Sequence, residues 1–229
     1  ERMATASGKT ELDYAISLKM VLELREIKVS EITGAIIGSV VPPVTSLMRE
    51  AIRKVTGQEA LVVNVDMNIG LEVLMDNPSS VGTDLIVGAV AGINRYPVPL
   101  ILIDMGTATT ICVVNENKQY IGGMILPGIG VSMNSLTSRT AQLPRISLDP
   151  PKRLIGKNTV ECMQSGALYG NASCIDGMVD RIEEELGQKA TVVATGGLAR
   201  KIIPLCRHQI ELDDELLLRG LWIIYKKNK

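Results

Sequence analysis

Residues 100–114 of this 229-residue chain, LILIDMGTATTICVV, are the most informative about its fold. Two apolar runs rich in β-branched residues flank Asp104-Met105-Gly106-Thr107, a pattern typical of a strand, a tight turn and a second strand. After a short polar turn, QYIGGMILPG at 119–128 has the composition of a third strand. The sequence therefore predicts three consecutive strands joined by short turns.

A second pattern occurs twice. AIIGSVVPPVTSLMREAI at 35–52 and TVVATGGLARKIIPL at 191–205 both indicate a strand, a small-residue turn and a helix. A duplicated unit determines the fold assignment, and parallel strands with intervening helices indicate the α/β class. We therefore expect two α/β domains, residues 1–97 and 98–229. The second copy has a hairpin and the first shows none, so we expect that an opening hairpin of the first domain is missing from the sequence.

Hydrophobic periodicity places the helices. Thr10 is the expected N-cap of the first helix, whose apolar positions are Leu12, Ala15, Ile16, Met20 and Leu24. The other expected helices and strands are helices at 44–55, 81–96, 159–186 and 213–229, a strand at 60–65 and an extended segment at 71–75. The chain has no phenylalanine, so the core must be built from aliphatic residues and methionine.

Composition excludes several functional classes. The net charge is −1 and no basic stripe occurs, which argues against a nucleic-acid partner. No apolar run is long enough to span a bilayer and the first residues are not signal-like, so we expect a cytoplasmic protein without a membrane partner. The single histidine, His208, has no partners for a nucleophilic triad, and we expect it to be structural or on the surface.

Two glycine turns are candidates for a nucleotide site. In the first, Gly106 lets backbone N–H groups face a phosphate, the Thr107 hydroxyl adds a donor and Asp104 can hold a cation. No lysine follows, so this is not a Walker loop. In the second, Gly196 and Gly197 allow an adenine or a ribose to lie against the backbone. An ordinary hairpin and an ordinary strand–helix turn would use the same residues, so both interpretations stay open.

A third candidate is NPSSVGTD at 77–84, which places Asp84 in the first turn of a helix. A carboxylate there stabilises the helix end by about 0.3–1 kcal/mol. From the residues alone, helix-end stabilisation is the favoured role, and the alternative is a general base that accepts the proton of a hydroxyl group. The residues alone leave both roles open.

Taken together, the motifs resemble the type III pantothenate kinases of the actin-like ATPase and sugar-kinase superfamily. The order of six motifs carries the resemblance: Asn77 to Asp84, Asp104 to Thr110, Gly122 to Gly128, Ala141 to Pro144, Ile155 to Thr159 and Thr195 to Leu198. Ala4-Thr5 with Lys9-Thr10, and Ser39 to Pro43, are also similar to that family.

The resemblance implies a duplicated actin-like (ribonuclease H-like) fold and ATP-dependent phosphorylation of pantothenate in coenzyme A synthesis. Asp84 matches the proton acceptor, and its neighbours Gly82, Thr83 and Leu85 match the segment that contacts pantothenate. Thr159 matches a pantothenate contact that reaches across a homodimer interface.

The resemblance also implies the nucleotide and cation sites. Asp104 matches the ligand of a monovalent cation, K⁺ or NH₄⁺, and Thr107 with Gly106 matches the ATP contact. Gly196 and Gly197 complete the nucleotide signature, and family members use Mg²⁺ with ATP.

Three features depart from the family pattern. The first phosphate loop, Asp-x-Gly-Asn-Thr, is not in the sequence. Leu85 stands where the family often has an arginine that could pair with the pantothenate carboxylate, and Met75 replaces a tyrosine that commonly contacts pantothenate. Two alternatives therefore remain: a kinase for another small hydroxyl acceptor, and a non-catalytic regulatory relative of the same fold.

Overall fold

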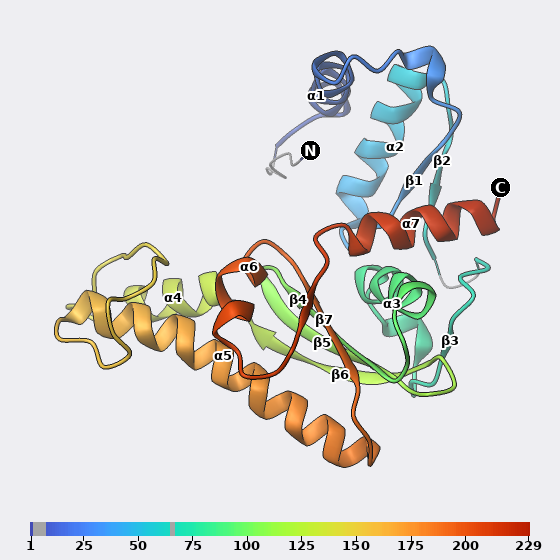
Figure 1. Cartoon of the computed structure of the whole chain (residues 1–229). Helices are drawn as coiled ribbons and strands as arrows, with labels where there is room; N and C mark the ends of the chain where they lie inside the picture. The colour runs from blue at the N-terminus through green and yellow to red at the C-terminus, as the bar shows by residue number, and fades with distance from the viewer. Residues whose placement is uncertain (2–7, 65–66) are drawn as a thin grey trace. The chain divides into compact units, whose positions relative to one another are not determined.

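The computed structural model describes residues 1, 8–64 and 67–229 (Figure 1). The Ala4-Thr5 motif and Val65, at the end of an expected strand, lie outside the described residues. The fold is mixed α/β, as expected. The chain divides into two compact units: unit 1 is Glu1–Gly70, Asn77–Val90 and Leu217–Lys229, and unit 2 is Leu71–Asp76 and Ala91–Leu216. The expected boundary after residue 97 separates two duplicated domains rather than two compact units. It therefore stays a prediction.

Unit 2 is built on a mixed sheet with the strand order β3-β6-β5-β4-β7-β8. The strands are β3 (Glu72–Val73), β4 (Leu100–Met105), β5 (Ala108–Val114), β6 (Gln119–Pro127), β7 (Thr191–Thr195) and β8 (Glu211–Leu212). The hairpin β4–β5 and the pair β5–β6 are antiparallel, whereas β7 runs parallel to β4. The three consecutive strands predicted from 100–128 are confirmed.

One buried cluster of unit 2 lies on one face of this sheet, and the alternate strand residues on the other face, such as Leu100 and Leu102, are buried as well. Helices α4 (Ile129–Ser138), α5 (Thr159–Leu186) and α6 (Ala199–Ile202) belong to this unit, and Figure 1 shows α5 running along the sheet. Alternate strand residues such as Ile101, Ile103 and Ile111 share a buried cluster with Leu168 and Val179 of α5. The core is aliphatic, as the absence of phenylalanine predicted. On the opposite face, a Cβ at Gly92 would lie 3.0 Å from Leu102 Cδ1, so the glycine permits close packing of α3 (Thr83–Arg95) on β4.

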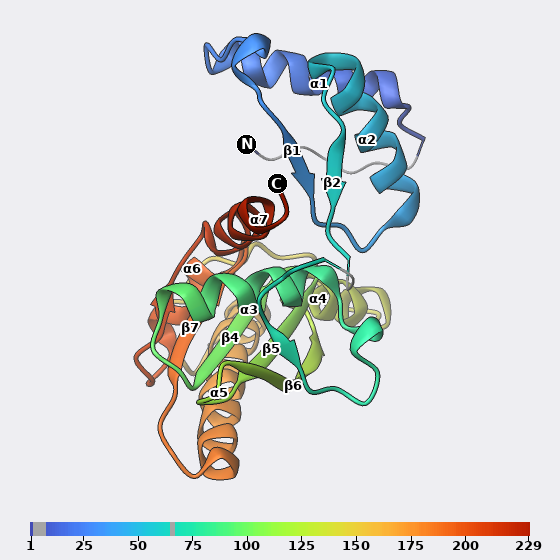
Figure 2. The same cartoon turned by 90° about the vertical axis from the view of Figure 1, so that its right-hand side faces the viewer.

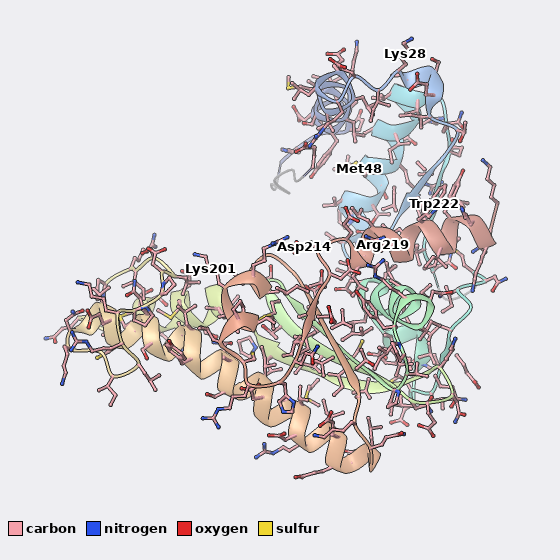
Figure 3. The ribbon with its side chains drawn as sticks, in the orientation of Figure 1. Lys28, Met48, Lys201, Asp214, Arg219 and Trp222 are labelled. Atoms are coloured by element: carbon pink, nitrogen blue, oxygen red, sulfur yellow. The ribbon has the colours of Figure 1, made fainter. Side chains whose placement is uncertain are left out.

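Unit 1 contains a two-stranded parallel sheet of β1 (Ala35–Ile37) and β2 (Ala60–Val62), with α1 (Glu11–Leu24) and α2 (Pro42–Thr56) (Figure 2). Helix α2 begins with proline in its first turn and ends at Gly57 in the left-handed conformation, φ 69°, which completes the predicted strand–turn–helix. Tyr14 of α1 packs near Ala51 and Met48 of α2, the latter labelled in Figure 3. The C-terminal helix α7 (Leu216–Lys227) has the expected basic end.

Several expectations were wrong in detail. Thr10 caps α1, as predicted, and also forms a capping box with Asp13. However, the apolar positions Leu12, Ile16, Met20 and Leu24 are 53% to 76% exposed, because α1 turns Tyr14 and Ala15 toward α2 instead. Helix α4 and strand β8 were not predicted, and β1, β2 and β3 are shorter than expected. In the part of the chain that is described, no helix is both long and apolar enough to cross a membrane.

Candidate active site

The first glycine turn is a two-residue connection at the tip of the β4–β5 hairpin. The N–H of Gly106 donates to the carbonyl of Ala108 at 3.0 Å, which closes the turn. The carbonyl of Thr107 accepts from the N–H of Gly128 at 3.1 Å. The turn predicted at Gly106-Thr107 therefore exists, and it is fixed from a second side by the start of α4.

Asp104 lies on the central strand between two threonines. In the sheet register it pairs with Thr110 on β5 and with Thr195 on β7. Directly paired residues point to the same face of a sheet, so a carboxylate and two hydroxyl groups share one row. Asp104 is half-buried and Thr195 is buried. The sequence did not single out this row, because strand pairing decides it.

The second glycine turn lies directly against Asp104. Gly196 has φ +98°, and a Cβ there would lie 2.6 Å from Asp104 Oδ1 and 2.6 Å from the Met105 nitrogen. Only a residue without a side chain fits both this conformation and this contact. Gly197 follows and is exposed. The structure thus brings together the two turns that the sequence placed far apart.

The motif from Gly122 to Gly128 supports the first turn, a role that sequence reasoning missed. A Cβ at Gly128 would lie 2.2 Å from the Thr107 carbonyl oxygen, so α4 begins in close contact with the turn. A Cβ at Gly123 would similarly lie 2.2 Å from the Ile111 carbonyl oxygen on β5. Met75 is placed beside this motif, since its sulfur lies 3.9 Å from the position of a Cβ at Gly122. The three glycines of this motif could have indicated the close backbone contacts from the sequence.

Asp84 belongs to unit 1 and is exposed in the first turn of α3. Its Oδ1 accepts from the N–H of Leu85 at 3.0 Å. A Cβ at Gly82 would lie 2.5 Å from the same Oδ1, so the glycine leaves room for this carboxylate. Gly82, Thr83 and Leu85 are half-buried. The contact with Leu85 suits helix-end stabilisation, and the exposure suits a base that meets a substrate.

Thr159 is the first residue of α5, after the N-cap Asn158, and is exposed. It lines a cavity of about 880 Å³ between α4 and α5. The lining is mostly apolar, with Ile129, Met133 and Leu136 from α4 and Met163 from α5. Thr159 is therefore part of a pocket of unit 2 that is separate from the two glycine turns.

A family model and a curated relative both match this chain. The family model of type III pantothenate kinase matches residues 1–181. A type III pantothenate kinase from Bacillus cytotoxicus is 44% identical over 227 residues, which is 99% of this chain and 87% of that protein. The chain belongs to the type III pantothenate kinase family.

Solved structures are more distant. A conserved Campylobacter jejuni protein, described as a transcriptional activator of the Baf family, is 21% identical with a TM-score of 0.49, covering 74% of this chain and 81% of its own. The ethanolamine utilization protein EutJ from Carboxydothermus hydrogenoformans is 14% identical with a TM-score of 0.46, covering 97% and 78%. At these TM-scores neither similarity adds to the assignment.

The row at Asp104 has the chemistry of a cation site. Strand pairing places one carboxylate and the hydroxyl groups of Thr110 and Thr195 in one row, and oxygen atoms are the ligands that hard cations prefer. The neighbouring turn at Gly106-Thr107 provides the backbone N–H groups that suit phosphate. Residues able to hold both charges are thus adjacent in unit 2.

A second cluster of possible metal ligands has another explanation. Asp180, Glu183 and His208 place one ligand atom each within 4.8 Å of one another. However, the Lys189 ammonium already lies 2.5 Å from Glu183, and His208 Nε2 lies 2.8 Å from Asp180. These contacts tie the end of α5 to the following loops. The expectation of a structural role for His208 agrees with this arrangement.

Proposed function

We propose that this protein transfers a phosphoryl group from ATP to pantothenate, giving 4′-phosphopantothenate and ADP in the first step of coenzyme A synthesis. The observation that carries the proposal is the assembly of Asp104 with the turns at Gly106-Thr107 and Gly196-Gly197, in a chain of this family. Phosphoryl transfer depends mainly on positioning and charge stabilisation. The two glycine turns would position the nucleotide, and a cation bound by Asp104 would stabilise its charge.

Asp84 is the proposed proton acceptor. The pantothenate hydroxyl oxygen forms a bond to the γ-phosphorus while the bond from phosphorus to the β,γ-bridging oxygen breaks; the hydroxyl proton passes to Asp84, and ADP leaves. The exposure of Asp84 and the space left by Gly82 support this role. We assign the remaining acceptor contacts to the residues Met75, Gly82, Thr83, Leu85 and Thr159.

The nucleotide side uses backbone and hydroxyl groups. The Gly106-Thr107 turn holds the phosphates, Gly196 and Gly197 contact the adenosine part, and Asp104 binds K⁺ or NH₄⁺. Bound Mg²⁺ and the monovalent cation would neutralise phosphate charge. Because the whole chain carries a net charge of only −1, long-range attraction contributes little to ATP binding. The affinity for ATP must therefore come from the local geometry of the two turns.

We also propose that the fold is a duplicated actin-like fold. Unit 2 contains the hairpin β4–β5, the strand β6, the helix α5 and then β7, a glycine turn and α6. Unit 1 repeats the last part of this order as β1, a small-residue turn and α2. The duplication predicts a hairpin with an Asp-x-Gly-Asn-Thr loop before β1. The full-length sequence tests this prediction, and a different segment there would contradict it.

A cytoplasmic homodimer is the proposed assembly, with Thr159 reaching the partner's pantothenate. Gly166 and Gly170 of α5 have nothing within 4 Å of where a Cβ would lie, so this stretch of the helix is open to close approach. Val131 and Val160 nearby are exposed apolar residues. Sedimentation velocity at micromolar concentration should give a dimer. A monomer would contradict the role of Thr159.

A coupled assay of ADP release with purified full-length protein tests the function. Pantothenate should stimulate ADP release far more than other small hydroxyl compounds do. Leu85 and Met75 favour one rival, a kinase of another acceptor, which a panel of such compounds would reveal. Absence of ADP release with every acceptor, despite ATP binding, would support the non-catalytic relative.

A further inference from the structure

The cavity between α4 and α5 has an uneven distribution of charge. Among the described residues that line it, Lys157 alone carries a charge. The other lining residues are apolar or carry hydroxyl, thiol or amide groups, such as Ser132, Leu143 and Asn171. A mostly apolar cavity with one convergent charge is typical of a site for a small molecule. The sign of that charge points to an acid.

The Lys157 ammonium is available for a ligand. Lys157 is exposed, and its ammonium is in none of the ion pairs found among the described residues. The nearby carboxylate of Glu161 instead accepts from the backbone N–H of Lys157 at 3.0 Å, and this hydrogen bond lowers the pKa of Glu161. Lys157 is also two residues before Thr159, on the same wall of the cavity.

We propose that Lys157 binds the carboxylate of the substrate acid and so selects pantothenate over its neutral analogues. Pantothenate has apolar methyl groups and an amide that suit the lining, and a carboxylate that needs a cation. Position 85, beside the proposed base, is leucine and cannot supply that cation. The inference rests on the proposed function. It concerns the carboxylate end only, and it holds whether the hydroxyl end meets Asp84 of the same subunit or of the partner.

The decisive experiment compares Lys157→Met with Lys157→Arg on two acceptors. One acceptor is pantothenate, and the other is its primary amide, which keeps the hydroxyl groups but has no charge. Lys157→Met should raise the KM for pantothenate about 10- to 100-fold, the usual value of a charge-assisted hydrogen bond. It should change the KM for the amide less than about twofold and leave the KM for ATP unchanged, because only the carboxylate contact is lost. Lys157→Arg should restore most of the pantothenate affinity.

Lys152→Met is the matched control. Lys152 is an exposed cation of the same loop that does not line the cavity, so its removal tests general charge effects. An equal loss with both acceptors, or the same loss in Lys152→Met, would overturn the proposal. If wild-type protein phosphorylates neither acceptor, the proposed function itself fails, which is a different outcome.

A measurement on wild-type protein covers the case in which Lys157→Met does not fold. Salt screens an exposed ion pair. The KM for pantothenate should therefore rise with ionic strength more than the KM for the amide does. Parallel curves for the two acceptors would contradict the role of Lys157.

Discussion

The phosphate turn of unit 2 and the Asp84 segment of unit 1 are held in different ways. Asp104 lies on a central strand with a paired strand on each side, and a Cβ at Gly196 would lie only 2.6 Å from its Oδ1. Asp84 is exposed at the start of a helix, and its carboxylate accepts a hydrogen bond from the N–H of the next residue. One carboxylate is part of the sheet, whereas the other is carried on the surface.

Function and stability should therefore be coupled at Asp104 and separate at Asp84. Changing a residue beside Asp104 must disturb strand pairing, so it should lower both the free energy of unfolding and the activity. Changing Asp84 should affect the activity alone, because few tertiary contacts depend on it. Substitutions at Asp84, Gly196 and Asp104 test the contrast, and one at Glu183 adds a buried carboxylate of α5 for comparison.

Asp84→Asn should have the largest effect on activity. The amide still caps the helix, so the free energy of unfolding should change by less than about 1 kcal/mol. It cannot accept the hydroxyl proton, so turnover should fall about 10²- to 10⁴-fold. A thermal melt, an ATP titration and a steady-state rate on one preparation measure this. Asp149→Asn, which removes another exposed carboxylate, is the control. A variant that keeps its turnover would remove Asp84 as the base.

Gly196→Ala should have the largest effect on stability. The new methyl group would meet Asp104 Oδ1 and Met105 at 2.6–2.7 Å, and φ +98° is strained for alanine. We expect a loss of about 2–4 kcal/mol, with weaker ATP binding. Gly88→Ala within α3 is the control, because its Cβ would lie 3.6 Å from Leu217 and alanine favours a helix. Equal denaturation midpoints for the two variants would contradict the tight fit at Gly196.

Asp104→Asn should have a moderate effect that depends on the cation. Without a monovalent cation, the carboxylate and the phosphates would repel. Replacing K⁺ by tetramethylammonium should therefore slow the wild-type enzyme at least about tenfold. Asp104→Asn should be slow in both salts and insensitive to the exchange. A wild-type rate that is the same in both salts would contradict the cation site.

Glu183→Gln should have the smallest effect, a change in the free energy of unfolding that depends on pH. Burial acts to raise the pKa of Glu183, but the Lys189 ammonium and the Ala190 N–H outweigh it, so the pKa is lowered. A carboxylate whose pKa is lowered by folding stabilises the fold at pH values above its ordinary pKa. This contribution is lost as the pH falls through the folded-state pKa. At neutral pH the free energy of unfolding of the wild type should exceed that of the variant by about 1 kcal/mol or less, because Lys189 is exposed and water screens its interaction with Glu183. Denaturation at several pH values should show the difference shrinking in acid. Glu184→Gln is the control.

Local patterns predicted much of the fold. The hairpin at 100–114, the cap at Thr10 and the full extent of α5 follow from short-range preferences and are confirmed. The buried face of α1 was predicted wrongly, because a helix with apolar residues on several sides does not specify which side meets α2. Helix α4 was missed because its sequence, IGVSMNSLTS, is rich in residues with weak helix preference.

The residue types of the site and their order, and hence the family, can be read from the chain alone, because each motif is a short run whose chemistry is local. Which motifs meet depends on the tertiary structure. Strand pairing places Gly196 against Asp104, and the packing of α4 on α5 forms a cavity in which Lys157 is the one charged residue among the described lining residues. These relations join residues far apart in the chain, and they are set by the burial of the sheet and helix faces rather than by neighbouring residues.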